Sequence, residues 1–236
     1  MSIALKCCER GPGRADGAMA RWVAVASALA AGVVLMAGTA ATQNVELDTT
    51  SLGDGPYAEM HTLLEKTIFK VDVLTLDVRF GPEYAERIED LVDGRSYRSS
   101  LADSVAAVAI HATNAWARIR FERNVSLGQF LGGIRDNMAH AREAGFLDPP
   151  DYEKIDGVVT DKFAFLGDRG IHDGDQLFYR IQGDTLRTIF QAADGRVLLD
   201  QTDVGPERRL AVLGSYQAPK SDFREGLIRS LFRRSS

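Results

Sequence analysis

The longest run of alternating apolar positions lies between Thr67 and Phe80 and predicts a central β-strand. The run is rich in β-branched and aromatic residues, and it ends at Gly81, before a proline that a strand interior does not accept. Both sets of alternate positions are largely apolar, so we expect the strand to lie inside a sheet that is covered on both faces. Lys70 and Asp72 share one face. Because a buried carboxylate needs a partner, we expect these two side chains to pair.

Apolar spacing outside this strand predicts helices around a second, half-buried strand. Residues 57–66 are ambiguous between a loop and a short strand. Ser100 followed by Asp103 resembles a helix-capping arrangement, and Ser126 is a typical N-cap residue. The pair Pro149-Pro150 predicts a break before the next helix. The expected elements are helices at 82–94 and from residue 100, a strand at 116–123, and helices at 127–144 and 152–166.

The last third of the chain has the pattern of an antiparallel meander. Short apolar runs are separated by tight turns, among them Asp194-Gly195, a favoured hairpin turn. A turn is also expected at Gly214, after a short helix. The expected elements are strands at 176–181, 185–190 and 196–200, and helices at 207–213 and 222–232. The whole order predicts an α+β fold with a large antiparallel sheet.

The N-terminal region predicts export. No charged residue occurs in residues 22–45, a run that follows a basic flank and leads into small residues. This is the pattern of a secretory signal peptide, and an uncleaved membrane anchor remains the alternative. Met19 would give a more compact leader than Met1. We expect residues 1–41 to be this signal or anchor, 42–56 a linker, 57–232 the folded domain and 233–236 a tail, with the domain in the periplasm or anchored facing it.

Composition excludes several classes of function. The net charge of -5 speaks against nucleic acid as the main partner. The two cysteines, Cys7 and Cys8, both lie in the leader, so the domain has neither a disulfide nor a thiolate metal site. The four histidines show no metal-ligand spacing, and Asp173-Gly174-Asp175 lacks the further acidic ligands of a calcium loop, so no metal or cofactor is expected.

Other residues that could carry chemistry have simpler structural explanations. Gly128, Gly132 and Gly133 follow no strand, so close helix packing is a better account of them than a phosphate loop. Arg118 and Arg120 share a strand face with Trp116. They could form a cationic groove, but a solvated face with a counter-charge at Glu122 is favoured.

Several strings together resemble the chalcone isomerase-like family, in particular its bacterial exported branch. Phe69-Lys70-Val71-Asp72-Val73-Leu74-Thr75-Leu76 is similar to the long strand of that family, and the run 119–126 (IRFERNVS) to its junction between strand and helix. Gly174-Asp175 before a Tyr-bearing strand and Leu213-Gly214 before a last helix complete the series. The resemblance covers about residues 57–232 and implies an open-faced β-sandwich, with helices packed on one face of a large antiparallel sheet.

The resemblance does not bring the family's catalytic residues with it. In that family, an arginine precedes the long strand and a threonine lies on it. In this chain the arginine position corresponds to Met60 or His61. The threonine position corresponds to Asp72, where a carboxylate would repel a developing oxyanion. The tyrosine position falls near Leu127 or Gly128. We therefore expect no catalytic residues. The same arginine and tyrosine would anchor a fatty acid carboxylate in the family's fatty-acid-binding members, and an uncharged apolar ligand remains open.

Three hypotheses follow. The leading one is a non-catalytic, exported chalcone isomerase-like protein that binds a small apolar or lipid-like ligand or acts as an accessory module at the cell envelope. The second is an intramolecular lyase or isomerase with a rearranged site around Asp72, and the third a purely structural or interaction protein. The sequence gives no oligomeric state. The candidate ligand-binding residues are Lys70, Asp72, Leu74, Phe130 and Ile134.

Overall fold

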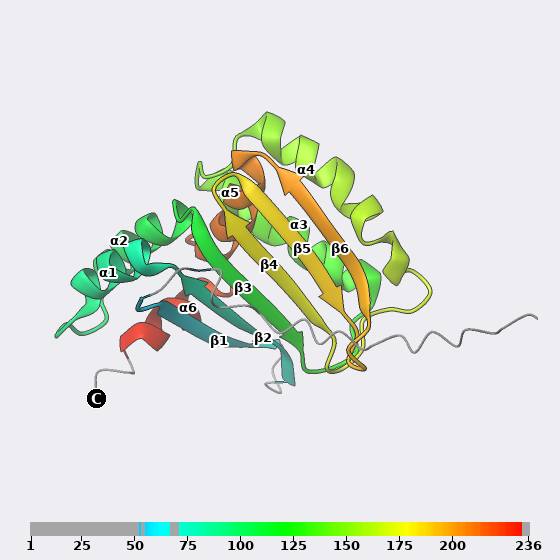
Figure 1. Ribbon diagram of the computed structural model, residues 1–236, viewed down its shortest axis with the longest axis horizontal. Helices are drawn as coiled ribbons and strands as arrows, with labels where there is room; N and C mark the ends of the chain where they lie inside the picture. The colour runs from blue at the N-terminus through cyan, green and yellow to red at the C-terminus, as the bar shows by residue number, and fades with distance from the viewer. Residues whose placement is uncertain (1–51, 53–54, 67–70, 233–236) are drawn as a thin grey trace, which may run out of the picture. The chain divides into compact units, whose positions relative to one another are not determined.

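The computed structural model describes Leu52 and residues 55–66 and 71–232. In this part of the chain six strands form one antiparallel sheet, in which each strand pairs with its neighbours in sequence (Figure 1). The expected signal or anchor, most of the linker and the tail lie outside the described residues. Among the described helices, none has both the length and the hydropathy that crossing a membrane requires.

The strands and helices follow the predicted order closely. The strands are β1 (Ala58–Lys66), β2 (Val71–Phe80), β3 (Asn114–Phe121), β4 (Gln176–Gln182), β5 (Thr185–Gln191) and β6 (Val197–Val204). The helices are α1 (Pro82–Val92), α2 (Ser99–Ile110), α3 (Leu127–Glu143), α4 (Pro149–Lys162), α5 (Pro206–Gln217) and α6 (Arg224–Phe232), with a short 3-10 turn, η2 (Ala164–Leu166). The ambiguous segment 57–66 is therefore a strand.

The central strand β2 is interior, between β1 and β3, but only one of its faces is buried. Leu76, Val78 and Phe80 are fully buried beneath the helices, whereas Asp77 and Arg79 on the opposite face are partly exposed. The prediction of a strand covered on both sides is thus wrong. The reason is that the neighbouring strands carry polar residues on that opposite face, so no second apolar layer packs there.

The open face of the sheet carries ion pairs. Arg118 donates two hydrogen bonds to Asp77, at 3.1 and 2.7 Å, and the His61 ring lies 2.6 Å from the same carboxylate. Burial by itself raises the pKa of Asp77, but these contacts outweigh it and lower the pKa. Arg79 and Arg118 lie over the Trp116 ring, which is only 2% exposed. The face is thus partly exposed and carries paired charges, as expected, but the counter-charge of Arg118 is Asp77, and Glu122 lies only near Arg120, at 3.8 Å.

The helix ends differ from expectation where capping chemistry decides them. The Ser126 hydroxyl accepts from the Gln129 N–H, and the Gln129 side chain accepts from the Ser126 N–H, a complete capping box at the start of α3. The cap predicted at Ser100 does not form, because α2 begins one residue earlier and makes no side-chain cap. Asp148 caps α4, so the two prolines open that helix rather than precede it, as the first helical turn allows.

The turn before β4 contains a buried carboxylate. Asp175 is fully buried and accepts two hydrogen bonds from Arg169, at 2.6 and 2.8 Å. It also accepts from the backbone N–H groups of His172 and Ala193, at 2.8 and 2.9 Å. Asp175 therefore holds the loop 169–175 in shape and joins it to the turn that follows β5.

Helices cover the buried face of the sheet. In Figure 1, α3, α4 and α5 lie on one side of the strands β3–β6. The predicted turn at Gly214 is wrong, because α5 continues through it. A Cβ there would lie 3.3 Å from Phe146 and 3.4 Å from Ala141, so the glycine permits close packing of α5 on α3.

Gly226 marks the contact between α6 and β1. A Cβ at this position would overlap Thr62 Oγ1 and lie 2.8 Å from Thr62 Cβ. We expect Gly226→Ala to lower the free energy of unfolding by about 1–3 kcal/mol, as overpacking does. Urea unfolding measures this, with Gly128→Ala as the control because a Cβ at Gly128 meets nothing within 4 Å. If the clash is the cause, adding Thr62→Ala restores part of the loss; equal loss in both backgrounds would contradict it.

Candidate ligand cavity

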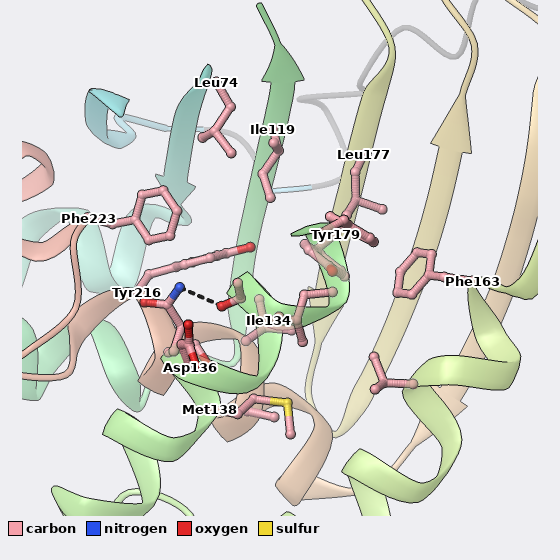
Figure 2. Close-up of a pocket in the computed structure, with 18 of the residues that line it drawn as sticks. Leu74, Ile119, Ile134, Asp136, Met138, Phe163, Leu177, Tyr179, Tyr216 and Phe223 are labelled. Carbon is pink, nitrogen blue, oxygen red and sulfur yellow. Dashed lines mark hydrogen bonds between the residues drawn. The ribbon is translucent and has the colours of Figure 1, made fainter. Parts of the chain in front are cut away.

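A cavity of about 380 Å³ lies between the sheet and the helices. This volume falls within the usual range of small-molecule sites, about 300–1,000 Å³. Figure 2 shows Leu74, Ile119, Leu177 and Tyr179 on the strands, with the side chains of helical residues facing them. Its walls are mainly apolar and come from strands β1 to β5, from α3, α4 and α5, and from the segment before α6.

The sheet wall of the cavity is long enough for an extended chain. Its length can be measured along β4, the strand between β3 and β5. At one end the lining residue Phe121 of β3 lies beside Asp175, one residue beyond the pair Arg120–Gln176; at the other end the lining residue Leu186 of β5 pairs with Ile181. Positions 175 and 181 are about six residues of strand apart, or about 20 Å. This shape suits an elongated apolar molecule rather than a compact one.

The helical wall is formed partly by one stripe of α5. Its lining residues are spaced so that they fall on one face of a helix. Figure 2 shows Tyr216 extending from this helical side toward the strands, and its ring packs edge-on against Phe223, with centroids 5.5 Å apart. The lining residues of α5 are Arg208, Ala211, Val212, Ser215 and Tyr216.

Two glycines of α3 contribute to the cavity. Gly132 and Gly133 both line it, and a Cβ built on either would meet nothing within 4 Å. The prediction that they serve close helix packing is therefore wrong. A glycine inside a helix costs about 0.5–1 kcal/mol relative to alanine, and no neighbouring atom demands it here. What the missing side chains provide is open space beside the cavity.

Two hydroxyl groups facing the cavity have no hydrogen-bond partner among the described residues. Thr188 of β5 is fully buried and Ser215 of α5 is 6% exposed, and the hydroxyl oxygen of each lacks a partner. Buried hydroxyls are normally bonded, and leaving one unsatisfied costs about 1–3 kcal/mol. The cavity thus presents unsatisfied polar groups on both its sheet wall and its helical wall.

Two tyrosines add phenol groups to the same cavity. Tyr179 pairs across the sheet with Thr188, so both side chains point to the same face. Burial raises the pKa of Tyr179, and burial together with the nearby Tyr179 raises that of Tyr216. Neither phenol makes a hydrogen bond to the residues that the structure describes. Both stay protonated at physiological pH and can donate a hydrogen bond, but neither is suited to act as a base.

The two arginines that line the cavity come from opposite ends of the sheet. Arg123 follows the end of β3, whereas Arg208 lies in the first turn of α5, at the opposite end of the sheet. Arg208 Nε is 3.8 Å from Glu207 Oε1, and Glu207 is bonded to Lys154 at 2.5 Å. Ser215 lies about 10 Å further along α5 than Arg208, given the rise of a helix. Lys162, Asp136 and Asp222 also line the cavity, and the two aspartates are exposed.

The structure places the predicted site residues as follows. Leu74, Phe130 and Ile134 line the cavity. Lys70 and the side chain of Asp72 lie outside the described part of the chain, so their pairing and any role in binding stay predictions. Sequence reasoning missed the four hydroxyl-bearing residues. One signal was present, since Thr188 occupies a core-facing position between apolar residues of β5.

Metal binding finds no support in this part of the chain. In the segments that the structure describes, no group of three or more His, Cys, Asp or Glu side chains is arranged to hold a metal ion.

The fold is α+β, a six-stranded open antiparallel sheet with helices on one face, of the chalcone isomerase-like type. The fold class expected from the sequence is confirmed. Among solved structures the chain is similar to the crystal structure of a fatty-acid binding protein from Arabidopsis thaliana, with a TM-score of 0.50 and 10% sequence identity. The match covers 76% of this chain and 87% of the plant protein. No protein-family model matches the sequence, and a search of curated proteins found no match.

Proposed function

We propose that this protein is a non-catalytic carrier that holds an elongated apolar or lipid-like ligand between its sheet and its helices. The observation that carries the proposal is the cavity of about 380 Å³ beside Gly132 and Gly133. Protein interiors are normally close-packed, so a space of this size indicates room for a ligand. The fatty-acid binding of the plant protein with this fold is consistent with it. The uncharged run at residues 22–45 supports a place for this carrier in the periplasm or at the cell envelope, as a member of the exported branch of the chalcone isomerase-like family.

The state of several groups in the described part of the cavity supports binding rather than chemistry. Its phenols have raised pKa values, and the lysine that lines it, Lys162, is bonded to Asp203. The family positions that would supply an arginine and a threonine hold other residues in this chain, His61 or Met60 and Asp72. His61 lies on the open face of the sheet with Asp77, away from the cavity.

The test is displacement of a fluorescent apolar probe from the full-length protein by unbranched alcohols of increasing chain length. Each added methylene group contributes about 0.8 kcal/mol when it is buried, so affinity should rise about fourfold per carbon. The rise should stop when the chain exceeds the lined length of about 20 Å. Native mass spectrometry of the protein isolated from its own cells should show a retained lipid-like mass. Failure of every alcohol to displace the probe would refute the proposal.

A further inference from the structure

The four hydroxyl groups of the cavity form one set. Thr188 and Tyr179 are cross-strand partners on the core face of β5 and β4. Ser215 and Tyr216 are consecutive residues of α5, which packs against β5. Tyr179 and Tyr216 both line the cavity, and Figure 2 shows Tyr216 extending from the helical side toward the strands. Sheet and helix therefore present hydroxyl groups to the same part of the cavity.

These groups require an acceptor that the described residues do not supply. A hydroxyl can rotate its proton toward whichever acceptor is present, and the two phenols remain protonated donors. Apolar walls with a few convergent polar groups are the usual form of a site that orients a ligand. A hydrocarbon chain alone would leave all four hydroxyl groups unsatisfied.

The surroundings of the hydroxyls favour an uncharged acceptor. An ionised carboxylate beside Ser215 would lose its hydration, while the backbone of Arg208 lies about 10 Å away along α5 and its Nε is 3.8 Å from Glu207 Oε1. Asp136 and Asp222, which also line the cavity, would repel an anion. A carbonyl oxygen meets the requirement, because it accepts two hydrogen bonds and carries no net charge.

We propose that the ligand carries a neutral carbonyl group within its apolar chain, and that the hydroxyls of Thr188, Ser215, Tyr179 and Tyr216 bind it. This rests on the proposed function, since it specifies the ligand class of the same cavity. The ligand is thus a long-chain ketone or ester rather than a plain hydrocarbon or an ionised fatty acid.

The test compares three compounds with the same number of non-hydrogen atoms: dodecane, dipentyl ketone and decanoate. Each displaces the apolar probe from the full-length protein and from a Thr188→Val/Ser215→Ala variant. Both substitutions remove a hydroxyl and nearly preserve shape. Loss of the hydrogen bonds should weaken the ketone about tenfold and leave dodecane unchanged. Thr202→Val, at an exposed position of β6, is the control and should change nothing.

The outcomes separate the two proposals. If none of the three compounds binds the unmodified protein, the proposed function fails. If dodecane binds but the variant holds the ketone as tightly as the unmodified protein does, only the carbonyl inference fails, and the hydroxyls bind ordered water instead. Tightest binding of decanoate, lost in Arg208→Gln, would also overturn the inference in favour of a carboxylate. Unchanged dodecane affinity shows that the variant is folded.

Discussion

Gly133→Leu is expected to lower the affinity of the cavity for an apolar chain about sixtyfold. The new side chain enters open space beside the cavity, where it takes the place of about three ligand methylene groups, each contributing about 0.8 kcal/mol. The protein should not lose stability, because leucine favours a helix more than glycine does, by somewhat less than 1 kcal/mol. Probe displacement gives the affinity, and urea unfolding gives the stability.

Gly128→Leu provides the matched control. Gly128 lies on the same helix, also has free space for a Cβ, and does not line the cavity. This variant should gain similar helix stability and bind the probe as the unmodified protein does. Equal affinities of the Gly133 and Gly128 variants would mean that ligand does not occupy the space beside Gly133, and that the glycines need another explanation.

Asp175→Ala should cause the largest loss of stability, about 3–5 kcal/mol. The carboxylate is fully buried and binds Arg169 as well as two backbone N–H groups. Removal leaves those N–H donors and a largely buried guanidinium without an acceptor. Asp194→Ala is the control, because its ion pair with Arg196 is exposed on both sides and should matter little. Urea unfolding midpoints check both, and equal midpoints would contradict the structural role of Asp175.

The same carboxylate should make stability depend on pH. Burial alone raises the pKa of Asp175, but hydrogen bonds from Arg169 and from the backbone outweigh it and hold the pKa below its ordinary value of 3.8. A carboxyl group with a lowered folded-state pKa stabilises the protein above the unfolded-state pKa, and that stabilisation is lost as pH falls through the folded-state pKa. Stability of the unmodified protein should therefore fall more steeply below about pH 4 than that of Asp175→Asn. Parallel pH profiles would exclude this contribution.

Several local signals predicted the fold correctly. The hairpin turn at Asp194-Gly195 and the N-cap at Ser126 each depend on a few residues, and the structure contains both, whereas the equally local cap signal at Ser100 failed. The open face of β2 could not be predicted from β2 itself, because it depends on the polar residues of β1 and β3 that flank it. Likewise, Gly214 carries a turn signal, but packing against Phe146 and Ala141 keeps it in a helix.

The cavity was only partly predictable for the same reason. Leu74, Phe130 and Ile134 were identified because a sheet covered by helices must bury such residues, and all three line the cavity. The free space at Gly133 depends on how far α3 lies from its neighbours. The hydroxyl set joins residues of three elements, and Thr188 and Ser215 are brought together only by the tertiary fold.

The sheet order β1 to β6, the same as the order in the chain, has a consequence for synthesis on the ribosome. Strands β1 to β3 can pair with one another as soon as residue 121 has emerged, because they are neighbours in the sheet as well as in the chain. One wall of the cavity, however, is α5, which begins only at Pro206. A nascent or truncated chain that ends before this helix has no closed binding site. Ligand can therefore stabilise only chains that have been translated beyond α5.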